Sequence, residues 1–205
     1  ARQLMAKGID VLEAHNLIPT LDATPDGETV YRKIGFAGDT ALARWTLTPD
    51  STLSGLAAVP GLKMRQVMDA DLDGIAAWDR GQSGCDRMAI FRFLKETRPD
   101  LAILAEREDG TPAGFVMGRS GHRMPQLGPL VADDSRIAGL LLKASSAAAK
   151  GPVYVDAFER TQPLLEADLP GSWSRERGFT RLLKADSSSP ENPKTVYLAA
   201  GPELS

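Results

Sequence analysis

The residues from Gln126 to Phe158, QLGPLVADDSRIAGLLLKASSAAAKGPVYVDAF, decide the architecture that we expect for this chain. The run 126–132 is short and apolar, which is typical of a strand, and Asp134 or Ser135 then stands at the N-cap position of a helix. Apolar residues recur at helical spacing until a second strand over 153–157. A strand, a helix and a strand in this order predict a β-α-β crossover.

Short strands and helices surround this crossover throughout residues 62–205. The order predicted for this segment is β-α-α-β-β-β-α-β-α-β-β, which implies a mixed sheet with helices on both faces, an α/β fold class. The predicted elements are strands over 64–67, 101–106, 112–119, 126–132, 153–157, 180–184 and 195–200, and helices from residue 71, over 87–96, from residue 135 and, at least in part, over 162–177. Asp109-Gly110 predicts a hairpin turn between the second and third strands.

The first 49 residues contain a shorter set of elements. Leu4, Gly8, Val11, Leu12 and His15 form one face of a helical period, so the chain starts inside a helix, and we expect its natural beginning to be missing. Asn16 is a left-handed terminator for this helix. Thr24-Pro25 predicts the start of a second helix that stops at Gly35, and a strand follows over 41–47.

An internal repeat relates the two segments. Asp22-Ala23 and Gly35-Phe36 recur as Asp156-Ala157 and Gly178-Phe179 within the same order of helices and strands. Residues 49–61 are rich in Pro, Gly, Ser and Thr without periodicity. The predicted organisation is the C-terminal half of a first domain (1–49), a linker (50–61) and a complete second domain (62–205).

Composition excludes several classes of protein. The 205 residues are 42% hydrophobic and 25% charged, as in ordinary globular proteins, and the net charge of −3 without a basic block argues against a nucleic-acid partner. No apolar run approaches the roughly 18 residues of a membrane span. One cysteine excludes an internal disulfide, and two isolated histidines argue against a histidine-rich metal site. We therefore expect a cytoplasmic protein without a metal.

One stretch resembles a known family. Val30-Tyr31-Arg32-Lys33-Ile34-Gly35-Phe36 is similar to the LYxxxGF element of the GNAT superfamily of acetyl-CoA-dependent N-acetyltransferases. The match is partial, because Thr24 and Gly27 stand where the family often has Asn and Ala. The order of elements in residues 62–205, Gly128-Pro129-Leu130 and the ending 200–204 resemble a tandem-domain bacterial subgroup with an acetyltransferase-like C-terminal domain. The resemblance implies two GNAT-like folds, the first without its N-terminal half in this chain.

The resemblance also implies where acetyl-CoA binds. In the family a Gly-rich turn at a helix N-terminus holds the pyrophosphate, because free N–H groups and the helix dipole favour an anion there. Ala1 and Arg2 stand at the end of such a turn, and Thr24 and Tyr31 stand at further cofactor positions. Tyr31 is the implied acid that protonates the leaving thiolate. The structural alternative for Tyr31 is packing against the edge of the sheet.

The second domain departs from this pattern. The stretch 131–139 lacks the pyrophosphate motif, and Asp133 and Asp134 stand where a diphosphate would dock. We therefore expect a domain that is weak or inactive as a transferase. Leu130, Val131 and Ala132 stay candidates for lining an acyl tunnel through their backbone. Asp156, among apolar neighbours, is a candidate base or contact for the acceptor substrate.

Two functions follow for the chain. The first is an enzyme that transfers acetyl from acetyl-CoA to a small-molecule or peptide amine, with its chemistry in the first domain. The second is a non-catalytic module of the same fold that binds a ligand or forms a homodimer.

Overall fold

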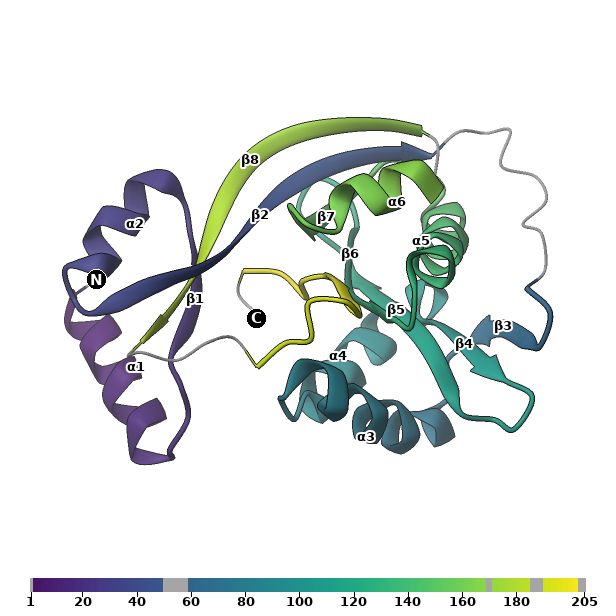
Figure 1. The fold of residues 1–205 in the computed structure, drawn as a ribbon, viewed down its shortest axis with the longest axis horizontal. Coiled ribbons are helices and arrows are strands. Elements are labelled where there is room, and N and C mark those ends of the chain that lie inside the picture. Colours follow the sequence, from purple (N-terminus) through teal and green to yellow (C-terminus); the bar gives the residue numbers. More distant parts are fainter. Residues whose placement is uncertain (1, 50–58, 169–170, 185–189, 203–205) are drawn as a thin grey trace.

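Strands from the whole length of the chain join in one β-sheet (Figure 1). The computed structural model describes residues 2–49, 59–168, 171–184 and 190–202. The strands within these residues are β1 (Thr20–Ala23), β2 (Phe36–Pro49), β3 (Leu62–Gln66), β4 (Ile103–Arg107), β5 (Pro112–Arg119), β6 (Gln126–Ala132), β7 (Val153–Phe158), β8 (Gly171–Lys184) and β9 (Val196–Leu198). They lie side by side in the order β1-β8-β2-β7-β9-β6-β5-β4-β3.

Six α-helices and two short 3₁₀ helices of the described residues accompany the sheet. They are α1 (Arg2–Ala14), α2 (Pro25–Arg32), α3 (Leu72–Ser83), α4 (Met88–Thr97), α5 (Ser135–Ala149) and α6 (Gln162–Asp168), with η1 (Asp69–Asp71) before α3 and η2 (Pro99–Leu101) after α4. The element order predicted for residues 62–205 is therefore confirmed over the described part of that segment.

The predicted β-α-β crossover is confirmed. β6 and β7 run parallel, with Gln126 opposite Tyr154, and α5 connects them. The Asp134 side chain caps α5, because it accepts a hydrogen bond from the Ile137 N–H at 2.8 Å. The pairs β3–β4, β4–β5 and β5–β6 are antiparallel, so the sheet is mixed, as expected.

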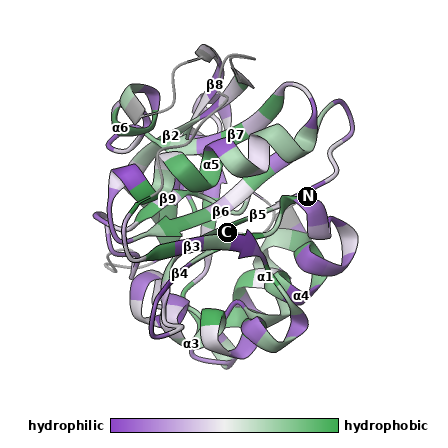
Figure 2. Ribbon diagram, turned by 90° about the vertical axis from the view of Figure 1, so that its right-hand side faces the viewer, coloured by the Kyte–Doolittle hydropathy of each residue, from purple (hydrophilic) through white to green (hydrophobic). Residues whose placement is uncertain are grey.

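Helices cover both faces of the sheet, which confirms the predicted fold class. α5 and α6 lie on one face, where Ile137, Leu141 and Leu165 join a buried apolar cluster with residues of the strands. α3 and α4 lie on the other face, where Ile75 and Phe91 join a second cluster. Figure 2 shows β5 and β6 between α5 and the pair formed by α3 and α4. Removal of these side chains from water is the main force that holds the layers together.

The first and last parts of the chain exchange strands, because β8 of the later part lies between β1 and β2 of the first part. β2 pairs antiparallel with β7 over residues 42–47, whereas β8 lies between β1 and β2. β2 and β8 each have 14 residues, pair along their length, and form the long arch in Figure 1. Residues 1–49 and the later part of the chain thus share one sheet. The division into two domains stays a prediction, and residues 50–58 of the predicted linker lie outside the described residues.

The Asp-Ala dipeptides of the repeat lie at matching places in the exchanged strands. Asp22 on β1 is directly opposite Arg181 on β8, and Asp156 on β7 is directly opposite Arg44 on β2. Both aspartate side chains are fully buried, and each accepts two hydrogen bonds of 2.8–3.0 Å from its arginine. A buried charge without such a partner is strongly destabilising. The two ion pairs therefore select which strands become neighbours.

The Gly-Phe part of the repeat does not match in three dimensions. Phe36 is the first residue of β2, whereas Phe179 lies inside β8, which begins at Gly171. The helix predicted within 162–177 is present as α6, but residues 171–177 are strand and not helix. Their polar sequence carries a weak local preference, and pairing with β2 determines their conformation instead.

The capping signals of the first segment are confirmed, and its first helix is present but mostly exposed. Asn16 follows α1 with a φ of 55°, Thr24 caps α2, and Gly35 ends that turn with a φ of 88°. Leu4 and Val11, on the predicted apolar face of α1, are 79% and 46% exposed. The helical period thus identified the helix without identifying what its face contacts.

The Asp22–Arg181 pair yields a stability prediction. Replacement of Asp22 with Ala removes two hydrogen bonds from the buried Arg181 guanidinium and leaves Glu191, at 2.8 Å, as its carboxylate partner among the described residues. We expect the free energy of unfolding to fall by about 3 kcal/mol, the lower end of the range for a broken buried pair. Urea denaturation measures this loss, and Asp10→Ala on the exposed surface of α1 is the control. A loss no larger than that of the control would contradict a role of this pair in holding β1 against β8.

Candidate functional site

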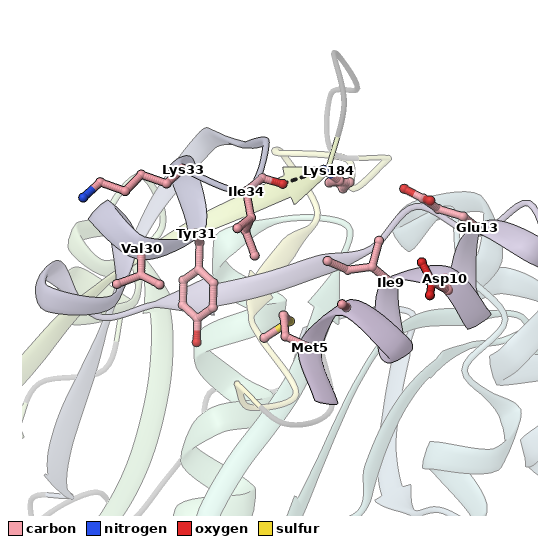
Figure 3. Close-up of a pocket in the computed structure, with 10 residues that line it drawn as sticks. Met5, Ile9, Asp10, Glu13, Val30, Tyr31, Lys33, Ile34 and Lys184 are labelled. Atoms are coloured by element: carbon pink, nitrogen blue, oxygen red, sulfur yellow. Dashed lines mark hydrogen bonds between the residues drawn. The ribbon is translucent and has the colours of Figure 1, made fainter. Parts of the chain in front are cut away.

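A groove of about 670 Å³ lies between α1 and α2 (Figure 3). α1 forms one wall, α2 and the turn after it form the other, and β8 reaches the groove through its last residue. The lining residues are Met5, Ala6, Ile9, Asp10, Glu13, Val30, Tyr31, Lys33, Ile34 and Lys184. The surface is mostly apolar with a few charged groups, and its volume is within the range of small-molecule sites.

Tyr31 lies in this groove because of how α2 begins. The Thr24 hydroxyl accepts a hydrogen bond from the Gly27 N–H at 3.4 Å, and Pro25 occupies the first helical turn. Tyr31 then falls in the last turn of α2, where its ring lies edge-on to Phe36 with centroids 6.2 Å apart. Figure 3 shows the hydroxyl pointing away from α2, on the side of the groove where Met5 lies. Tyr31 therefore packs on the sheet and also presents its hydroxyl to the groove.

The charges of the groove are divided between its walls. Asp10 and Glu13 lie on the α1 side, whereas Lys33 and Lys184 lie on the side of α2 and β8. The Lys184 ammonium donates a hydrogen bond to the Ile34 carbonyl oxygen at 2.5 Å, near the C-terminal end of α2, where a cation is favourable. An anionic ligand would therefore be favoured on the α2 wall and disfavoured next to α1.

The remaining cofactor positions expected in the first segment are only partly placed. Thr24 is not among the groove residues, and its hydroxyl is used as the cap of α2. Arg2 is the first residue of α1, and Ala1 lies outside the described residues. Of Thr24 and Tyr31, the two predicted cofactor positions of the first segment whose side chains the structure describes, Tyr31 lines the groove.

The corresponding helix start in the second segment is occupied by the chain itself. Asp134 caps α5, and Asp133 forms an ion pair with Arg107. Partial burial raises the pKa of Asp133, the Arg107 charge opposes this shift, and Asp134 adds to it. An incoming phosphate would meet two carboxylates here and an N–H group that is already bonded.

β9 fills the gap between β6 and β7. These two strands pair at Gln126 and Leu127, and further along β6 the neighbour is β9, with Leu130 opposite Leu198 and Val131 opposite Val196. The Ala132 N–H donates to the Thr195 carbonyl oxygen at 2.9 Å. Leu130, Val131 and Ala132 are fully buried between β5 and β9, so their backbones face neighbouring strands and not an open tunnel. The cofactor role predicted for these three residues stays a prediction, which this packing does not favour.

The space between the two helices is open in the first segment, whereas in the second segment the corresponding helices pack together. In both segments a strand separates the two helices along the chain: β1 lies between α1 and α2, and β7 lies between α5 and α6. Leu165 of α6 is buried in the same apolar cluster as Ile137, Ala138 and Leu141 of α5. The described residues thus provide a groove between α1 and α2, whereas α5 and α6 pack against one another.

Asp156 lies in an internal network and not at the groove. Its carboxylate accepts two hydrogen bonds from Arg44 at 2.8 Å and one from the Gln126 side-chain amide at 2.6 Å. A general base must reach the proton that it removes, directly or through one water. The geometry therefore favours a role for Asp156 in holding β2 against β7 over the predicted role as base or acceptor contact.

Within the described ranges, no group of three or more His, Cys, Asp and Glu side chains is arranged to hold a metal ion. No helix of the described chain combines the length and apolar character needed to cross a bilayer.

The sequence patterns did not identify Lys33, Lys184, Asp10 and Glu13 as site residues. Lys33 lies within residues 30–36, the stretch around Tyr31 that carries the family resemblance, so the sequence indicated its surroundings but not its place in the site. Lys184 reaches α2 only because β8 enters the sheet beside β1 and β2, a long-range pairing without a local signal.

Comparison with known proteins agrees with this architecture. Residues 75–198, more than half of the chain, match the family model described as an acetyltransferase (GNAT) domain. No match is found among curated proteins.

Among solved structures, the chain is similar to a GCN5-related N-acetyltransferase from Sphaerobacter thermophilus, with 16% identity and a TM-score of 0.59 over 82% of this chain and 59% of that one. It is also similar to a proposed acetyltransferase from Pyrococcus horikoshii (21% identity, TM-score 0.61, 87% of this chain and 56% of that one). A GCN5-related N-acetyltransferase from Kribbella flavida gives 12% identity and a TM-score of 0.56, over 87% of this chain and 72% of that one.

The likeness to these structures supports the fold, and the chain spans less than two thirds of the length of the first two. The family model extends from α3 to β9 and so covers the crossover and the strands around it. The chain belongs to the GNAT family of acetyltransferases, a family of transferases.

Proposed function

We propose that the protein is an acetyl-CoA-dependent N-acetyltransferase and that the groove between α1 and α2 binds part of the cofactor. The acceptor is an amine of a small molecule or a peptide. The observation that carries the proposal is the position of Tyr31, the residue that the family motif marks as an acid, in a groove of about 670 Å³.

The groove suits an elongated ligand with an apolar arm and an anionic end. Met5, Ile9 and Val30 offer apolar contacts. Lys184 places a cation at the end of the α2 wall, where it would favour phosphate groups, whereas the Lys33 side chain extends away from α1 in Figure 3. Asp10 and Glu13 would keep those groups away from the α1 wall, so the charges orient the ligand as well as bind it.

Acetyl-CoA supplies a thioester, whose carbonyl carbon is attacked by the neutral amine as the carbon–sulfur bond breaks. The departing sulfur takes up a proton, and the Tyr31 hydroxyl is the donor in this proposal. Such proton transfer typically contributes a factor of roughly 10²–10⁴ to the rate. The nitrogen of the product loses its extra proton to solvent.

The second segment has a supporting role in this proposal. It donates β8, which completes the sheet under α1 and α2 and brings Lys184 to the groove. Its own helix start is filled by Asp133, Asp134 and Arg107, and β9 fills the adjacent gap in the sheet. These features favour the non-catalytic reading for this segment alone.

The groove can be tested by blocking it. Ala6 lines it, whereas Lys7 is exposed and is not among the lining residues. Ala6→Trp should weaken acetyl-CoA binding by about 1–3 kcal/mol, on the order of ten- to a hundredfold, because the indole occupies the ligand's space. Lys7→Trp should leave it unchanged. Isothermal calorimetry measures both, and a wild-type protein that gives neither heat nor a thermal shift with acetyl-CoA contradicts the enzyme proposal.

The role of Tyr31 has a separate test. Tyr31→Phe removes the hydroxyl and keeps the ring against Phe36. We expect turnover to fall about 10²–10⁴-fold with nearly unchanged acetyl-CoA affinity, because only the proton donor is lost. The release of free CoA thiol, followed with an amine that the wild-type protein acetylates, measures this effect. Unaltered turnover would remove Tyr31 from the mechanism.

A further inference from the structure

Helix α2, which carries Tyr31, is held to the sheet without a fully buried residue of its own. Burial of an apolar face is what usually fixes a helix in a protein. The Tyr31 ring is partly buried against a small cluster that includes Phe36 and Leu182, whereas the Val30 side chain is 48% exposed. Polar contacts therefore have a larger share in fixing α2 than in fixing α5, whose apolar side chains are buried.

The first polar contact joins the middle of α2 to β8. The Glu28 carboxylate accepts a hydrogen bond from the Thr180 hydroxyl at 2.9 Å and, through its other oxygen, two from the Arg32 guanidinium at 2.8 Å and 2.6 Å. These hydrogen bonds, that of Arg32 first, lower the pKa of Glu28, so the acceptor is a carboxylate anion at neutral pH. A Cβ atom at Gly38 of β2 would lie 2.6 Å from an Arg32 nitrogen, so this glycine leaves the room that the guanidinium occupies beside the sheet.

The second polar contact joins the end of α2 to the last residue of β8. The Lys184 ammonium donates a hydrogen bond to the Ile34 carbonyl oxygen at 2.5 Å and lies 5.9 Å from the centre of the Phe36 ring. Gly35 makes this approach possible, because a Cβ atom there would lie 2.6 Å from the ammonium nitrogen. The Lys184 backbone N–H donates to the Pro19 carbonyl oxygen at 2.9 Å. The turn that follows α2 is thus tied to β8 as well.

Both contacts come from one face of β8. Thr180 and Lys184 are four residues apart on this strand, so their side chains point to the same side of the sheet, with Leu182 between them. Leu182 is fully buried in the cluster against which the Tyr31 ring packs. β8 therefore contacts α2 and its following turn on both sides of the tyrosine along the chain.

We infer that Thr180 and Lys184 are positioning residues, which hold α2 so that the Tyr31 hydroxyl faces the groove. The inference rests on the proposed function, in which Tyr31 gives a proton to the departing sulfur. A proton donor accelerates the reaction only within hydrogen-bond reach of the atom that it protonates, and small displacements of such a group are costly. The second segment, whose own helix start is filled, therefore acts on the reaction through the alignment of a helix in the first segment.

Amide hydrogen exchange of the complete chain tests whether β8 holds α2, without reference to activity. Thr180→Val keeps the branched side chain and removes the hydroxyl donor, and Lys184→Met keeps the aliphatic stem and removes the ammonium. We expect the amides of residues 25–36 to exchange about tenfold faster in each variant, because local opening of α2 no longer breaks a hydrogen bond that involves a charged group. Mass spectrometry of peptides from this stretch measures the rate.

Thr46→Val is the matched control. The Thr46 hydroxyl also donates to a glutamate across β2 and β8, Glu176, at 2.6 Å, and this contact does not involve α2. Its loss should leave the exchange of residues 25–36 at the wild-type rate. Exchange in Thr180→Val or Lys184→Met that is no faster than in this control would remove that residue from the inference, and the same result in both would overturn it.

Turnover separates the alignment of Tyr31 from stability alone. With an amine that the wild-type protein acetylates, Thr180→Val should lower kcat about three- to tenfold and leave the KM for acetyl-CoA unchanged, because Thr180 does not line the groove. In the Tyr31→Phe protein the same substitution should have no further effect, because no hydroxyl is left to align. Unchanged kcat in the first case, or an equal loss in both, would overturn the inference. A wild-type protein that does not bind acetyl-CoA contradicts the proposed function instead, and the exchange rates still decide whether β8 holds α2.

Discussion

The pairing of β2 with β8 holds together parts of the chain that are more than a hundred residues apart in sequence. Each strand contributes 14 residues. On its other edge β8 pairs with β1 and β2 pairs with β7, so β1 and β7 lie on opposite sides of the pair. The exchange is specified by charge as well as by backbone hydrogen bonds, because Asp22 and Asp156 each have an arginine directly opposite. Slippage by one residue would separate these buried charges, which is a stronger constraint than apolar alternation alone.

The two segments differ in the space and the free hydrogen-bond donors that they leave for a ligand. In the second segment, β9 closes the gap beside β6, α6 packs on α5, and Asp134 caps the helix start. Each of these contacts adds stability and removes space or free donors that a ligand would need. In the first segment the space between α1 and α2 stays open, and Lys184 of β8 reaches it. A single sheet therefore supports one filled region and one with room for a ligand.

Local features of the fold were predictable from sequence, and long-range ones were not. The cap of α5, the left-handed Asn16 and the Asp109-Gly110 turn depend on residues close together in the chain, and all three are present. Residues 171–177 were misassigned because their strand conformation depends on β2, more than a hundred residues earlier. The site residues divide in the same way. Tyr31 is part of a local sequence motif, whereas Lys184 reaches the groove because β8 pairs with β1 and β2.

The family assignment and the candidate site lie in different parts of the chain. The family model matches residues 75–198, whereas nine of the ten groove residues precede residue 35. A family model responds to the pattern of buried strands and helices, which the second segment preserves. Ligand binding depends on a few groups at a helix start and on open space beside the strands, and these can be lost while the apolar pattern persists. Membership of the family and location of the chemistry are therefore separate questions, and in this chain the open groove with its tyrosine is the physical reason for proposing that the chemistry lies in the first segment.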